Sequence, residues 1–205
     1  MKRISALCLA AALGLCPLPT AKAQGNPESA KLARQGSEAA KAADWDKAIA
    51  AFRKAAEMDA KWNTNLAAAL QQRGAVYMSQ QKFPEAAADF TEALKITPRD
   101  AAIHERRAYV EMKLHEVDKA LADYSEAIKI NPQEIRYYMP RAYIYEVKGD
   151  LKNSMADTEH VLKVDKNNAE AQARKARLEK IQKMKANEQA NAPGNTPIPA
   201  PPPKK

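Results

Sequence analysis

The sequence alternates large and small apolar residues at helical spacing. In the stretch PEAAADFTEALKITP (84–98), Phe90 and Ala93 stand three residues apart, and polar residues fill the positions between them. An apolar residue at every third or fourth position predicts an amphipathic helix. Pro98 ends this helix because proline cannot continue one. The preceding stretch LQQRGAVYMSQQ (70–81) predicts a partner helix, and the break at KFPE joins the two.

This helix pair recurs along the chain. Further second helices are predicted at 46–60, 118–132 and 152–166, and their first helices at 32–43, 104–115 and 138–149. Small residues share one position in the first helices and one in the second: Gly36, Gly74, Ala108 and Ala142, and Ala48, Ala86, Ala120 and Ser154. Only small side chains let two helix backbones approach closely, so each pair predicts a helical hairpin.

With its unit of about 34 residues and this helix-turn-helix pattern, the sequence resembles the tetratricopeptide repeat (TPR) family. The resemblance covers four units, 29–62, 67–100, 101–134 and 135–168. It implies an all-α, right-handed superhelical solenoid of about four TPR repeats. The extra residues 63–66 amount to one helical turn and can lengthen the next first helix. Pro140 is expected in or near the first turn of its helix, where the backbone donor is free anyway.

Residues 169–190 predict one more helix, with Leu178, Ile181 and Met184 as a narrow apolar stripe. A repeat array needs a polar cap over its last hairpin, so we interpret this segment as a capping helix. The alternative is a basic helix that binds anionic lipid or a polyanion. Residues 191–205 are rich in proline and are expected to form a disordered tail; a ligand for another domain is the alternative.

The first 23 residues have the pattern of a cleavable signal peptide. Two basic residues precede an apolar run (4–18), and AKA at 21–23 provides a cleavage site after Ala23. A retained anchor is the alternative, but the run is shorter than the roughly 20 residues that span a bilayer. A lipoprotein fits poorly because Leu15 precedes Cys16. We expect a periplasmic or secreted protein without stable membrane insertion after cleavage.

The charge distribution and the cysteine content exclude some classes of function. The formal net charge is +8, and residues 24–166 contribute nothing to it because their 22 basic and 22 acidic residues cancel. The excess lies in the signal peptide and from residue 169 onward, and the folded middle is electrostatically mixed. No nucleic-acid partner is expected. Both cysteines lie in the signal peptide, which leaves a mature chain without disulfides or cysteine chemistry.

No constellation of residues predicts catalysis, a cofactor or a metal site. His104, His115 and His160 have no partner at metal-ligand spacing and are expected at the surface or the edge of the core. The sequence has no phosphate-binding loop, dinucleotide fingerprint or nucleophile motif. Carboxylates such as Asp89 and Glu92 lie at helical-surface spacing and are expected on solvated faces. The chain is therefore predicted not to be an enzyme.

The TPR resemblance implies that the first helices line a concave surface. Residues at positions i, i+4 and i+7 of these helices, with two nearby arginines, form the predicted peptide-binding groove: Gln71, Met78, Glu105, Arg106, Tyr109, Met112, Arg136, Met139, Tyr143 and Glu146. Tyrosine offers rigid area with a polar tip, and methionine adapts to irregular partners. Packing between helices is the alternative, especially for Met139 and Tyr143.

The same resemblance weighs against one role known in the family. Some cytosolic members bind acidic C-terminal peptides through a clamp of Lys, Asn and Arg, and here Ala33 and Ser37 replace the Lys and Asn. We therefore predict a non-catalytic interaction scaffold or adaptor in the cell envelope, whose partner is another protein or peptide segment. The alternative is association with the envelope surface through the basic C-terminal helix and tail.

Overall fold

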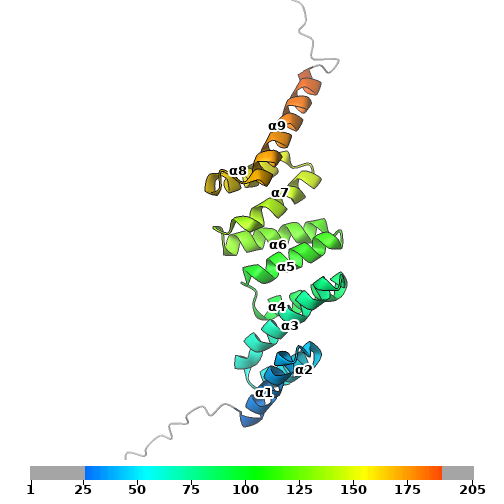
Figure 1. The fold of residues 1–205 in the computed structure, drawn as a ribbon, viewed down its shortest axis with the longest axis vertical. Coiled ribbons are helices and arrows are strands. Elements are labelled where there is room, and N and C mark those ends of the chain that lie inside the picture. The colour runs from blue at the N-terminus through cyan, green and yellow to red at the C-terminus, as the bar shows by residue number, and fades with distance from the viewer. Residues whose placement is uncertain (1–25, 191–205) are drawn as a thin grey trace, which may run out of the picture.

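The computed structural model describes residues 26–190 and shows an elongated stack of helices (Figure 1). Consecutive helices form four hairpins: α1 (Pro27–Lys41) with α2 (Trp45–Met58), α3 (Asn63–Ser79) with α4 (Phe83–Ile96), α5 (Ala101–Lys113) with α6 (Val117–Ile130), and α7 (Tyr138–Val147) with α8 (Leu151–Val164). A ninth helix, α9 (Ala169–Ala190), follows the last hairpin. The predicted all-α solenoid with a C-terminal helix is confirmed. The predicted signal peptide and tail lie outside the described residues.

Small residues bring the two helices of a hairpin together, as the sequence pattern predicts. A Cβ atom added to Gly74 would lie 2.8 Å from Cε1 of Phe90, closer than real Cβ contacts. In the first hairpin the corresponding distance from Gly36 to Cδ1 of Phe52 is 3.0 Å. The aromatic ring of the second helix therefore fills the space that the missing side chain leaves.

The turn of every hairpin ends the first helix with a residue in the left-handed region. This residue is Ala43, Gln81, His115 or Gly149, with φ of 56°, 59°, 62° and 78°. Only glycine adopts this conformation without steric cost. The turn is thus set by the packing of the two helices rather than by local preference in three of the four hairpins.

Two irregular segments take the places expected from the sequence. The extra residues 63–66 form the first turn of α3, after a short 3-10 turn, η1 (Ala60–Trp62). A second 3-10 turn, η2 (Ile135–Tyr137), precedes α7, and Pro140 is the third residue of α7. Its missing donor is therefore in the first turn, where no intrahelical acceptor exists.

The hairpins stack through the second helix of one unit and the first helix of the next, and α9 packs on α8 in the same way. α9 thus occupies the place of a fifth first helix and buries Ala171 and Leu178 completely. Its C-terminal half extends beyond the last hairpin (Figure 1). Of the helices between residues 26 and 190, none has the length and apolar character needed to cross a bilayer.

Candidate functional site

Two tyrosines occupy the same position in consecutive first helices. Tyr109 on α5 is 44% exposed, and Tyr143, one unit later on α7, is 47% exposed. A cation lies over one side of each ring: Lys113 Nζ is 5.3 Å from the ring centre of Tyr109, and the Arg174 guanidinium carbon is 5.9 Å from that of Tyr143. The exposed remainder of both rings is available to a ligand. We call this pair the tyrosine face.

Partly exposed polar contacts accompany the tyrosine face. Gln71 Nε2 donates to Asp100 Oδ2 at 3.5 Å, and Arg106 Nη1 donates to Gln71 Oε1 at 3.5 Å. Arg136 Nη2 lies 3.3 Å from Glu105 Oε2. Burial raises the pKa of Glu105, although the charges of Arg136 and Arg106 oppose the shift. Because these contacts are long and near solvent, each group can exchange its present partner for a ligand atom.

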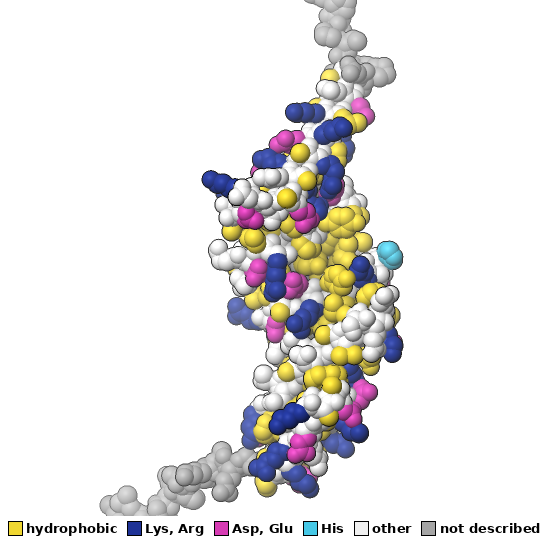
Figure 2. Space-filling view, in the orientation of Figure 1, with side chains coloured by type: hydrophobic (Ala, Val, Ile, Leu, Met, Phe, Trp, Pro, Cys, Tyr) yellow, Lys and Arg dark blue, Asp and Glu magenta, His cyan; other side chains and the backbone are white. Residues whose placement is uncertain are grey.

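The three predicted groove methionines lie deeper than the tyrosines. Met139 is 8% exposed and belongs to a buried cluster with Tyr137 and Tyr138. Met78 and Met112 are partly buried and pack against the hydrophobic clusters. The thioethers thus fill space between helices, which is the alternative reading of Met139. The face drawn in Figure 2 carries a band of hydrophobic side chains at the level of α5 to α7.

The last predicted groove residue, Glu146, is held by α9. Arg177 donates from Nε to Glu146 Oε1 at 2.9 Å and from Nη2 to Oε2 at 2.7 Å. The buried Arg174 adds a bond from Nη1 to Oε2 at 3.0 Å. Glu146 therefore docks α9 rather than presenting a free carboxylate. The surface that carries Tyr143 continues directly onto α9.

An ion-pair ladder that the sequence analysis missed crosses each of the last three hairpins. An arginine of the first helix donates two parallel hydrogen bonds, of 2.6 to 2.8 Å, to a buried aspartate 16 residues later. The pairs are Arg73–Asp89, Arg107–Asp123 and Arg141–Asp157. The expectation that Asp89 lies on a solvated face is wrong, because Asp89 is 4% exposed. The regular recurrence of Arg and Asp at unit spacing was the available signal.

The same arginines also connect neighbouring hairpins. Arg107 Nη1 donates to the hydroxyl of Thr91 at 3.2 Å, and Arg141 Nη1 donates to that of Ser125 at 3.3 Å; both acceptors lie on the preceding second helix. Lys175 on α9 continues the series with a 3.0 Å bond to Glu159 on α8. We call these contacts, together with the three pairs, the arginine–aspartate ladder. It fixes the register of the stack.

Comparison with known families agrees with this architecture. Residues 72–135 match the family model described as tetratricopeptide repeat. The chain therefore contains tetratricopeptide repeats, and its helices form the solenoid of that fold. The matched stretch contains α4 and α5 and the arginine–aspartate pairs of units two and three. Among curated proteins no match to this TPR protein was found.

Solved TPR structures share its fold. A TPR protein from Parabacteroides merdae is 24% identical with a TM-score of 0.60, over 80% of this chain and 62% of the other. YrrB, a TPR protein described as having an unusual peptide-binding site, is 19% identical with a TM-score of 0.60, over 77% and 80%. The first TPR of Spaghetti (RPAP3), solved with the HSP90 peptide SRMEEVD, is 24% identical with a TM-score of 0.54, over 57% and 93%. At these identities the likeness shows the fold alone.

The third TPR unit departs from its neighbours at one ladder position. In units two and four the ladder arginine is followed four residues later by tyrosine, and the guanidinium carbon lies over that ring. The distances to the ring centres are 5.7 Å for Arg73–Tyr77 and 5.6 Å for Arg141–Tyr145. Unit three has Glu111 in this place, so a carboxyl group replaces an aromatic ring.

The surroundings of Glu111 disfavour the ionised form of its carboxyl group. The residue is 7% exposed, its Oε1 lies 3.8 Å from Arg107 Nε, and its Oε2 has no hydrogen-bond partner. Burial, followed by the charge of Asp123, raises the pKa of Glu111 to about 7, against the opposing charge of Arg107. Glu111 is therefore partly protonated near neutral pH.

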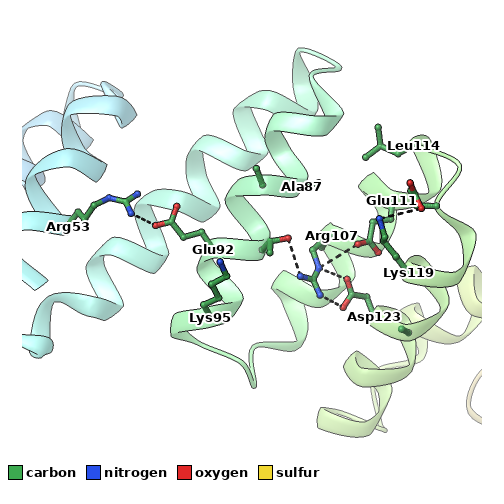
Figure 3. A pocket seen from close by; sticks show the side chains of 13 residues that line it. Arg53, Ala87, Glu92, Lys95, Arg107, Glu111, Leu114, Lys119 and Asp123 are labelled. Carbon is green, nitrogen blue, oxygen red and sulfur yellow. Dashed lines mark hydrogen bonds and ion pairs between the residues drawn. The ribbon is translucent and has the colours of Figure 1, made fainter. Parts of the chain in front are cut away.

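Glu111 and Arg107 also line an open pocket of about 920 Å³ between α4 and α6 (Figure 3). Most of its charges are paired within the protein: Arg53 Nη1 lies 2.5 Å from Glu92 Oε1, and Lys119 Nζ lies 3.4 Å from Glu116 Oε2. The lining mixes cations and carboxylates, so neither sign of charge dominates. The pocket thus lacks the arrangement that would select an anion or a metal ion.

Two of the three histidines make contacts within the fold, and the third is exposed. His104 is buried, with Nδ1 at 2.7 Å from Asp123 Oδ1 and Nε2 at 3.0 Å from the carbonyl oxygen of Pro98. His160 stacks on Tyr138 with ring centres 4.0 Å apart, and His115 lies exposed in a turn. In the part of the chain that the structure describes, no group of three possible metal ligands occurs.

Proposed function

We propose that this TPR protein is a non-catalytic interaction scaffold that binds a peptide or protein segment of a partner in its concave groove. The tyrosine face carries the proposal, because two half-exposed tyrosines on consecutive first helices offer rigid amphipathic area of the kind enriched in binding sites. Proteins of similar fold support this mode of peptide binding: the first TPR of RPAP3 was solved with a bound peptide, and YrrB is described as having an unusual peptide-binding site.

The first unit contributes little to this groove. Ala33 is buried, and the hydroxyl of Ser37 donates back to the carbonyl oxygen of Ala33 at 2.9 Å. Neither residue offers the cationic and amide groups of the clamp that binds acidic C-terminal peptides in some TPR proteins. We therefore place the ligand on α3, α5 and α7, with Tyr109 and Tyr143 as its anchors.

The basic C-terminal helix is the less favoured binding element. Of its six cationic side chains, Arg174, Lys175 and Arg177 already pair with carboxylates of α7, α8 or α9. Changing Lys180, Lys183 and Lys185 to glutamine together tests this element without touching those contacts. A salt-sensitive loss of binding to anionic vesicles in that variant would favour envelope-surface association instead.

The proposal includes export to the periplasm of a Gram-negative bacterium. It predicts that protein purified from the periplasmic fraction begins at Gln24 by N-terminal sequencing. Full-length protein with an intact first residue in the cytoplasmic fraction would contradict the export step and leave the groove proposal unaffected.

A capture experiment tests the groove. The mature chain, residues 24–205, is immobilised and exposed to native envelope extract beside a Tyr109→Ala/Tyr143→Ala variant. The control is Met58→Ala/Val164→Ala, which removes comparably exposed apolar side chains at the ends of second helices. We expect a protein retained by the wild type and the control and lost by the tyrosine variant, with equal helicity by circular dichroism. Equal capture by all three chains would refute the groove.

A further inference from the structure

The chain carries a sequence of the type that aromatic grooves bind. The segment after α9 is NAPGNTPIPAPPPKK (191–205), in which six of fifteen residues are proline. Pro199 and Pro202 form a P-x-x-P pattern, which favours polyproline II. Polyproline segments dock on aromatic-lined grooves because their conformation is largely fixed before binding.

The repetition of the tyrosine face suits such a segment. Tyr109 and Tyr143 occupy equivalent positions of first helices in adjacent units, and both rings are about half exposed. One turn of polyproline II contains three residues and rises about 9 Å. Pro199 and Pro202 lie one turn apart on the same side of such a helix, so the segment offers one proline to each ring.

The charge around the rings also fits. Each ring already has a cation over one side, Lys113 for Tyr109 and Arg174 for Tyr143. A second cation would be repelled there, whereas an uncharged ligand would not. Residues 197–203 (PIPAPPP) carry no charged side chain.

The length of the segment allows it to return to the groove. From Arg174, which lies over Tyr143, α9 continues sixteen residues to Ala190, or about 24 Å at the rise of an α-helix. About eight residues of polyproline II cover the same distance backwards. The return therefore reaches Tyr143 near residue 199 and leaves enough chain to cross Tyr109.

We propose that residues 199–203 of this chain occupy its own groove, with Pro199 against Tyr143 and Pro202 against Tyr109. The proposal rests on the proposed function, because it takes the concave groove to be a peptide-binding surface. It makes the C-terminal segment an internal competitor that a partner must displace.

Photo-cross-linking in the mature chain tests the occupant. An Ala200→p-benzoylphenylalanine chain places the probe between the two prolines. A Gly194→p-benzoylphenylalanine chain serves as control, because on the proposed path residue 194 would lie beside α9 and not at the tyrosine face. Cross-linked peptides are identified by mass spectrometry. A mixture of isotopically light and heavy chains separates cross-links within one chain from those between copies.

We expect the probe at position 200 to cross-link within one chain to peptides of α5 and α7. We expect this product to be lost in the Tyr109→Ala/Tyr143→Ala background and in Pro199→Ala/Pro202→Ala. The probe at position 194 should not give it. Mixed light–heavy products would overturn the proposal in favour of a second copy, and scattered products or none would overturn it altogether.

The cross-linking result is separable from the capture experiment. Tyrosine-dependent capture without the intramolecular product would leave the proposed function standing and remove the internal competitor. The intramolecular product without any captured protein would show the occupied groove and remove the partner-binding role.

Discussion

Replacing Glu111 with glutamine should stabilise the protein at alkaline pH and much less at acidic pH. The carboxyl group is buried where units two and four have tyrosine, and one of its oxygens has no partner. Glutamine keeps the shape and removes the charge. The change therefore removes the cost of burying a carboxylate, and that cost exists only when Glu111 is ionised.

The magnitude follows from the pKa of Glu111, which is raised from its ordinary value of 4.5 to about 7. Between these values the folded chain holds a proton that the unfolded chain has released, so the wild-type free energy of unfolding falls as pH rises. Once both states are ionised, above pH 7, the loss amounts to about 3 kcal/mol. Part of it is already present at pH 5, so the advantage of Glu111→Gln should grow by about 2 kcal/mol between pH 5 and pH 8.

The assay is urea denaturation of both chains, followed by circular dichroism at intervals from pH 5 to pH 8. The difference between the two chains isolates Glu111 because their other titratable groups are the same. Glu111→Tyr, which restores the residue of the neighbouring units, should show the same change in pH dependence. If the wild-type and Glu111→Gln stabilities run parallel from pH 5 to pH 8, the raised pKa and the reasoning behind it are wrong.

Three further substitutions test the packing. Asp157→Ala leaves the mostly buried Arg141 unpaired and should lower the free energy of unfolding by about 3 kcal/mol in urea titration; a loss below 1 kcal/mol would show that the ladder adds little. Gly74→Ala should lower the free energy of unfolding by about 1–3 kcal/mol, and the thermal midpoint with it, although alanine favours helix, because the new Cβ meets Phe90; a raised midpoint would show that the ring moves aside. Arg177→Ala removes a largely exposed partner of Glu146 and should change stability by less than about 1 kcal/mol, so a larger loss by the same titration would give α9 docking more weight.

The repeated hairpins could be predicted because their signal is local. Glycine or alanine opposite an aromatic residue recurs in the first three units, and Gly74 against Phe90 shows the contact that this pattern implies. The position of Pro140 followed from the same reasoning, since a helix tolerates proline only in its first turn. Tyr109 and Tyr143 lie exposed on consecutive first helices, and whether they bind a ligand is a matter for the capture experiment.

The charged residues were harder to place. Asp89 has the spacing of a helix-surface residue, and its burial arises only when Arg73 of the other helix covers it. Glu146 faces the predicted groove by period, but α9 reaches it from 28 and 31 residues further along the chain. Periodicity describes one helix at a time, so it cannot predict the contacts that side chains of other helices make.

The ladder bears on how the stack would respond to mechanical load. The two ends of the described array lie at opposite ends of its long axis (Figure 1). Unit one has Gln35 and Ala51 where later units have the ladder arginine and aspartate, and its ion pairs to unit two run through the largely exposed Asp46 and the half-exposed Arg53. Under tension between the ends, α1 and α2 should therefore detach at the lowest force. The first lengthening step would release about 35 residues, or roughly 120 Å of extended chain, while units two to four stay joined.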